Sequence, residues 1–182
     1  KEVKQKQNLE TNKQPSNIEA EQALIGSILV NNDILDEVSI IVGSKMFYDP
    51  AHIKIYEVIE NLNNKGMIAN PITLKNYFEK DNMLQDVGGT EYLVKLTRFS
   101  SSTKQAVDYA KIIHEMYLRR ELILISDKLS SDSTNANDQD QNAENIIEST
   151  EKSLFDLAER GSFSQSFLKF DKALDQTIKM AT

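Results

Sequence analysis

The chain has 182 residues, of which 40% are hydrophobic, with no cysteine and a formal net charge of −7. The lack of cysteine excludes a disulfide framework and a thiolate metal site. The acidic balance argues against a chain that mainly grips a phosphate backbone. With six Gly and three Pro, the composition favours helices joined by polar loops, and we therefore expect an all-α fold. No apolar run is long enough for a membrane span and no signal peptide is visible, so we expect a cytoplasmic protein without a membrane partner.

The N-terminal stretch is rich in Lys, Gln, Asn and Glu and has almost no apolar anchor. This composition predicts a disordered arm over residues 1–15. The first helix is expected at a capping box, in which the Ser16 hydroxyl accepts a hydrogen bond from the amide of Glu19. Gly26 in the middle of this helix predicts close packing of another helix. The buried stripe of the helix is expected to contain Leu24, Ile25, Ile28 and Leu29.

Cap and breaker residues divide the next segment into short helices. Asp49-Pro50 and Asn70-Pro71 each combine an N-cap with Pro at the first helical position. Gly66 is expected to end the first of these helices, and Gly88-Gly89 to break the chain before another short one. These features predict a multi-helix globular head over residues 16–102.

A longer helix is predicted from Thr103 to Leu129, because no Pro or Gly interrupts this run. The polar run from Ser130 to Gln141 is expected to be a loop, and a second helix from Asn142 to Glu159 follows. The two helices would form a long antiparallel hairpin over residues 103–161. They carry more apolar positions than one two-helix contact covers, which predicts a surface for self-association with four candidate residues: Tyr117, Leu124, Leu154 and Phe155.

The last stretch, residues 162–182, is predicted to be a linker and a C-terminal linker helix. Phe170, Leu174 and Ile178 recur every four residues and form a narrow apolar stripe. Such a stripe is typical of a helix that lies in a groove on a partner.

No catalytic, cofactor-binding or metal-binding residue is predicted. His52 and His114 lie far apart in the sequence, and a structural or surface role is expected for both. No Gly-rich loop followed by Lys and Ser or Thr is present to cradle phosphates. Arg119 and Arg120 are expected to pair with neighbouring Glu residues.

Four blocks of sequence together resemble the N-terminal part of bacterial replicative hexameric helicases, the DnaB family. Their order and spacing make the resemblance specific over residues 16–125, whereas residues 126–182 match in pattern only. The blocks are Ser16–Ser27, Phe47–Tyr56, Ile72–Leu93 and Tyr109–Ile123.

The resemblance implies a helical head, a hairpin and a linker helix that docks on the ATPase domain of a neighbouring subunit. In the family this region is an N-terminal collar, built as a trimer of dimers above a ring of RecA-like ATPase domains, and it receives primase. The chain is therefore expected to be a non-catalytic fragment of a replicative helicase, with ATP and Mg²⁺ bound by the domain that it lacks. The expected partners are further copies of the chain and primase, with a helicase loader as a candidate third. Little or no direct binding of nucleic acid is expected.

Two alternatives stay open at this point. The helicase-binding domain of bacterial primases is similar in fold, but it would lack the Gly88-Gly89 block and the stripe of Leu174 and Ile178. A small helical enzyme or nucleic-acid-binding module would need convergent titratable groups or a basic face, and the sequence shows neither.

Overall fold

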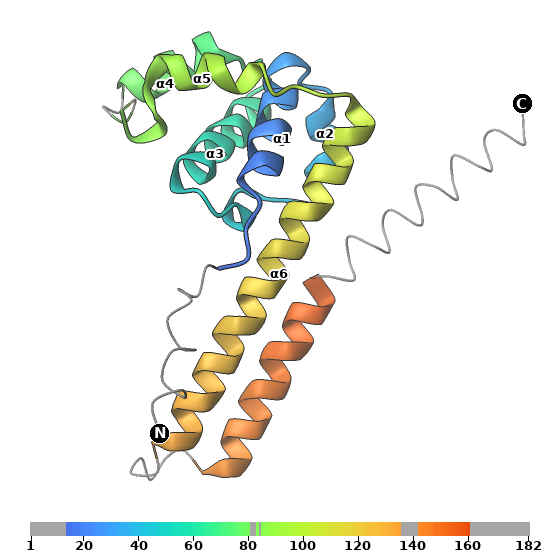
Figure 1. Ribbon diagram of the computed structural model, residues 1–182, viewed down its shortest axis with the longest axis vertical. Helices are drawn as coiled ribbons and strands as arrows, with labels where there is room; N and C mark the ends of the chain where they lie inside the picture. The colour runs from blue at the N-terminus through green and yellow to red at the C-terminus, as the bar shows by residue number, and fades with distance from the viewer. Residues whose placement is uncertain (1–13, 81–82, 84, 136–141, 161–182) are drawn as a thin grey trace, which may run out of the picture.

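A computed structural model describes residues 14–80, 83, 85–135 and 142–160 of the chain. The described residues contain helices and no strand, so this part of the fold is all-α, as predicted. Figure 1 shows short helices gathered at one end of the molecule and longer helices that extend away from them. In chain order the elements are α1 (Ile18–Val30), α2 (Ile34–Val38), the 3₁₀ turn η1 (Ser44–Met46), α3 (Pro50–Asn64), α4 (Pro71–Lys80), the 3₁₀ turn η2 (Gln85–Val87), α5 (Gly89–Thr97), α6 (Thr103–Thr134) and a helix over residues 143–160.

Helix α1 is the centre of the short-helix region, which we call the head. It packs most extensively on α6 and α5, and it also contacts α3 and α2. Because neighbours surround it, α1 buries nearly all residues from Ala20 to Leu29 and not only one stripe. The predicted stripe is part of this core and is fully or almost fully buried: Leu24, Ile25, Ile28 and Leu29.

The close helix contact predicted at Gly26 is confirmed. A Cβ atom on Gly26 would lie 2.1 Å from the carbonyl oxygen of Leu96, at the C-terminal end of α5. The backbone of α5 therefore approaches α1 at a point where only hydrogen fits. Just beyond it, the amide of Ser101 donates to the hydroxyl of Ser27, at 2.9 Å.

Several predicted helix ends are confirmed, whereas the predicted start of α1 is wrong by one residue. Asp49 caps α3 by accepting from the amide of Ala51 at 2.8 Å. Asn70 accepts from the first free amides of α4. The prediction of Ser16 as the N-cap of α1 is wrong, because Asn17 takes this role and accepts from Ala20 at 2.9 Å.

Two glycines end or precede helices through a left-handed backbone conformation. Gly66, with φ of +67°, follows α3, and the amide of Met67 donates back to the carbonyl of Leu62. This is a Schellman C-terminus. Gly88 has φ of +86°, and a Cβ there would lie 2.8 Å from the Cβ of Tyr92, so both conformation and space favour glycine before α5.

Helix α6 is longer than predicted. It begins after a capping box formed by Ser102 and Gln105 and ends at Thr134, so the expected loop from Ser130 starts within the helix. The hydroxyl groups of Ser133 and Thr134 donate to carbonyls four residues back. These polar residues satisfy their hydroxyl groups on the helix itself, and no Gly or Pro stops them from extending it.

The helix over residues 143–160 runs antiparallel beside the second half of α6 (Figure 1). Asn142 caps it by accepting from the amide of Asn145 at 2.8 Å, as predicted. The expected arm up to residue 13 and the expected linker-helix residues Phe170, Leu174 and Ile178 lie outside the described residues.

Candidate interaction surface

The surroundings of α6 change at its midpoint. In its first half Ala106, Ala110 and Ile113 are buried in the core of the head. No residue of α6 is buried from Glu115 to Thr134. We call this second half, together with the helix over residues 143–160, the hairpin.

The two hairpin helices pack closely but bury little. One small cavity of about 20 Å³ lies between them, and Leu157 is the one buried residue on the described helix over 143–160. This thin contact leaves most side chains of both helices in solvent. The residues that line the small gap are mostly polar: Ile125, Lys128, Leu129, Asp132, Ser149, Thr150 and Ser153.

Large apolar side chains remain exposed on both hairpin helices, and we call them the hairpin surface. Phe155 is 63% exposed and Leu124 is 55% exposed. Leu122 and Leu129 are seven residues apart, as are Ile147 and Leu154, so each pair forms a row along one side of its helix. The hairpin surface consists of Leu122, Ile123, Leu124, Leu129, Ile147, Leu154 and Phe155. These exposed apolar side chains make the hairpin surface the candidate interaction surface.

Arg120 joins the start of the hairpin to the head. Its guanidinium donates to the carbonyl of Pro15 at 2.7 Å and to the carbonyl of Met46 at 2.6 Å, and it lies 5.6 Å from the centre of the Tyr48 ring. Burial lowers the pKa of the guanidinium, and the nearby carboxylate of Glu21 opposes this change. An arginine stays charged under these conditions, so Arg120 acts as a fixed cationic tie between three segments of the chain.

The prediction for Arg120 is therefore wrong, while that for Arg119 is confirmed. Arg119 pairs with Glu115 at 2.7 Å, one turn before it on the exposed side of α6. Arg120 instead faces the head. Its spacing of seven residues from Ile113 places it on the buried stripe, and this was the sequence signal that the prediction missed.

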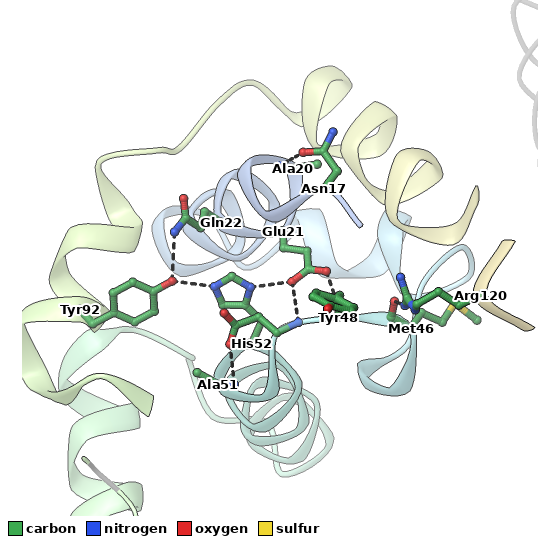
Figure 2. A network of polar contacts seen from close by, with 11 residues as sticks. Asn17, Ala20, Glu21, Gln22, Met46, Tyr48, Ala51, His52, Tyr92 and Arg120 are labelled. Carbon is green, nitrogen blue, oxygen red and sulfur yellow. Dashed lines mark hydrogen bonds and ion pairs between the residues drawn. The ribbon is translucent and has the colours of Figure 1, made fainter. Parts of the chain in front are cut away.

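Behind this tie lies a buried polar network, which Figure 2 shows from close by. The carboxylate of Glu21 in α1 accepts from the amides of Tyr48 and Asp49 and from Nδ1 of His52, at 2.7, 3.3 and 2.7 Å. Nε2 of His52 lies 2.7 Å from the hydroxyl of Tyr92 in α5. A neutral imidazole with its proton on Nδ1 satisfies every one of these bonds.

The network joins α1, α3 and α5. The His52 side chain is fully buried, and the hydroxyl of Tyr92 also accepts from the amide group of Gln22 at 3.1 Å. Burial raises the pKa of Tyr92, which keeps its hydroxyl protonated as a donor. The arrangement stabilises the head, in line with the structural role expected for His52.

His114 is a second buried histidine, at the point where α6 leaves the head. Its side chain is 7% exposed, and its Nε2 atom has no hydrogen-bond partner in the described part of the chain. Burial lowers the pKa of His114, and the neighbouring Glu115 opposes this effect. The neutral form is thus favoured in the folded protein.

Across the described residues, no group of three or more His, Asp or Glu side chains converges as a metal ion would require. None of the described helices has the combined length and apolar character that crossing a bilayer takes.

The structure places the predicted surface residues as follows. Leu124, Leu154 and Phe155 are exposed on the hairpin, and Tyr117 is partly buried near its start. The sequence prediction omitted four further exposed apolar residues, although their seven-residue spacing was visible for two pairs: Leu122, Ile123, Leu129 and Ile147.

Comparison with known proteins assigns this architecture to a protein family. The family model described as the DnaB-like helicase N-terminal domain matches residues 13–115. The replicative DNA helicase DnaB of Rickettsia felis is 38% identical over 164 residues, which cover 90% of this chain and 33% of the relative. The chain thus spans about a third of the length of the curated relatives it matches.

Two solved structures share the fold. The N-terminal domain of DnaB helicase from Mycobacterium tuberculosis matches with a TM-score of 0.70 and 24% identity, over 79% of this chain and 99% of that one. A DnaB-like replicative helicase, whose structure was described with its interactions with primase, matches with a TM-score of 0.63 and 20% identity. That match covers 85% of this chain and 35% of the helicase.

Proposed function

Because this chain belongs to the family of DnaB-like helicase N-terminal domains, we propose that it is the non-catalytic assembly module of a replicative DNA helicase. The relatives are replicative helicases about three times as long as the matched region. In this proposal, hydrolysis of ATP with Mg²⁺ and DNA unwinding belong to a RecA-like domain of the longer protein. The family assignment favours this function over the alternative of a primase domain.

The exposed apolar residues of the hairpin surface support the proposal that the chain assembles with copies of itself. Phe155 is 63% exposed on a helix that contributes a single buried residue, Leu157, to the described structure. A helix pair that leaves its large apolar side chains in water gains free energy when a second pair covers them. Part of that gain is offset by the freedom lost on association, so we propose a weak to moderate dimer that can build a trimer of dimers.

The division of labour along the chain follows from this proposal. In this proposal residues 16–102 contain the short helices of the head, and residues 103–161 contain α6 and the helix that pairs with it. Residues 162–182 would supply a linker with a helix that docks on the ATPase domain of a neighbouring subunit. The first half of α6 also contributes core residues to the head, so the head and hairpin share one rigid element. This sharing suits a collar, because the head then sets the direction of the hairpin.

Primase is the proposed partner of the assembled collar, with a helicase loader as a second partner. The support is the similar fold of the DnaB-like helicase that was solved with its interactions with primase. Exposed apolar residues on the hairpin, such as Leu124 and Leu154, supply the kind of surface that such docking requires.

Sedimentation of the chain from about 1 to about 100 µM tests self-association. The double variant Leu154→Ser, Phe155→Ser should remain folded and weaken association about tenfold or more, which corresponds to about 1.4 kcal/mol. The matched control is Ile68→Ser, Ile72→Ser, which removes two still more exposed apolar side chains from the head and should leave association unchanged. A wild-type chain that is monomeric at the highest concentration would refute the proposal.

A further inference from the structure

The described N-terminal end of the chain is attached to the hairpin and not to the outer side of the head. Arg120 holds the carbonyl of Pro15 at 2.7 Å. Figure 1 shows this end, in blue, beside the middle of α6 and on the side away from the helix over residues 143–160. The first described residues, Gln14 and Pro15, therefore lie next to α6.

The face of α6 next to this exit is uncovered in the described structure. Leu124 and Asp127 lie four and seven residues beyond Arg120, so helical spacing puts all three on one side of the helix. Leu124, Asp127 and the adjacent Ile123 are all exposed. We call these three residues the α6 face.

The charges of the two segments are complementary. Residues 1–13 contain four Lys and two Glu, together with two apolar residues, Val3 and Leu9. The hairpin residues, 115–134 and 143–160, contain nine acidic and five basic residues. The hairpin is therefore the acidic part of the molecule nearest to the point where a basic segment leaves it.

The length of the segment also fits. Thirteen extended residues reach roughly 40 Å, whereas α6 rises only about 21 Å from Arg120 to Thr134. Because Pro15 is already held, docking of the segment is an intramolecular event with an effective concentration in the millimolar range. Weak contacts are then enough to populate the docked state.

We propose that residues 1–13 dock along α6 on the face of Ile123, Leu124 and Asp127, with their lysines on the acidic hairpin. The segment would cover the side of the hairpin that faces away from the helix over residues 143–160. Leu154 and Phe155, on that other helix, would remain open to a further copy. The proposal goes beyond the assembly function and does not depend on it.

Paramagnetic relaxation tests this docking in the full chain. The protein has no cysteine, so Asn8→Cys provides a single site for a nitroxide label. Amides of residues 121–131 should broaden at least about twofold more than those of α4 or of residues 143–160. The difference should shrink from 0.1 M to 1 M salt, where the screening length falls from about 10 to about 3 Å.

Charge variants test whether residues 1–13 dock on the α6 face. Asp127→Lys should weaken the selective broadening about twofold or more, whereas Glu148→Lys, the same change on the other helix, should have little effect. Equal effects of the two variants, or broadening spread evenly over the molecule, would overturn the proposal in favour of a solvated tail.

An equimolar mixture of spin-labelled unenriched chain and unlabelled ¹⁵N-enriched chain separates docking within one chain from docking between two. Broadening in this mixture as strong as in the singly prepared sample would show that the segment meets a second copy, and would overturn the proposal. The variant Leu154→Ser, Phe155→Ser should keep the full pattern of broadening. Sedimentation of this variant tests the proposed self-association separately. The docking proposal and the assembly proposal can therefore be refuted independently of one another.

Discussion

The two halves of α6 share one backbone but lie in different surroundings. The half that belongs to the head places Ala106, Ala110 and Ile113 in the core, and the half that belongs to the hairpin has no buried residue after His114. Both halves nevertheless carry apolar residues at helical spacing. Apolar periodicity on this helix therefore marks a core in one half and an exposed surface in the other.

The polar groups of the two regions differ in the same way. In the head, buried Glu21 and His52 satisfy one another and bring together α1, α3 and α5. On the hairpin, ion pairs such as Arg119 with Glu115 are exposed, and exposed pairs stabilise a helix by only a few tenths of a kcal/mol. The head is thus stabilised by buried polar bonds and a core, whereas the described hairpin has few buried contacts of its own.

The same substitution in the two regions gives the sharpest test of this contrast. Leu93→Ala in the fully buried part of α5 should lower the free energy of unfolding by about 3 kcal/mol, because it removes buried methyl groups and leaves a cavity. Leu124→Ala on the hairpin, where the side chain is more than half exposed, should cost about 0.5 kcal/mol or less. Urea unfolding in dilute solution measures both values.

A comparable loss of stability from both variants would contradict the contrast between a buried head and an exposed hairpin. It would mean that the hairpin contributes to the folding of the single chain as much as the head does.

The network of Glu21 should have the next largest effect. Glu21→Gln replaces one carboxylate oxygen by a donor that faces the His52 imidazole or a backbone amide, and should cost about 2 kcal/mol. Gln22→Ala, the neighbouring position, removes only a partly buried bond to the Tyr92 hydroxyl and should cost about 1 kcal/mol or less. Equal costs in chemical denaturation would show that the buried carboxylate has no special role.

His114 should give the smallest effect, visible as pH dependence. Because burial lowers the pKa of His114 in the folded chain, the unfolded chain takes up the proton at a higher pH. Stability is then present above the ordinary histidine pKa of about 6.5 and is lost as the pH falls towards the folded value. Between about pH 7.5 and pH 5, the wild type should lose more stability than His114→Gln.

The other titrating groups are common to both proteins and cancel in this comparison. An identical pH dependence of unfolding for wild type and variant would show that His114 does not change its protonation on folding.

Local features of the fold were predictable because they depend on residues close in sequence. Asp49 caps α3 through an amide only two residues away, and Gly66 ends the same helix through its own left-handed conformation. The same local physics explains the errors. Ser16 and Asn17 are both good caps, and the choice between them depended on how the chain enters the head.

The sequence by itself determined the all-α class, the order of most helices and the family, since caps, breaks and apolar spacing act within a few residues. Only the tertiary structure decided which apolar positions are buried, and so distinguished Ile113 from Leu124 on the same helix. It also decided the contacts of Arg120 with Pro15 and of His52 with Tyr92, across 105 and 40 residues. Such bonds form only where packed helices bring distant groups together, and no local pattern of residues encodes that meeting.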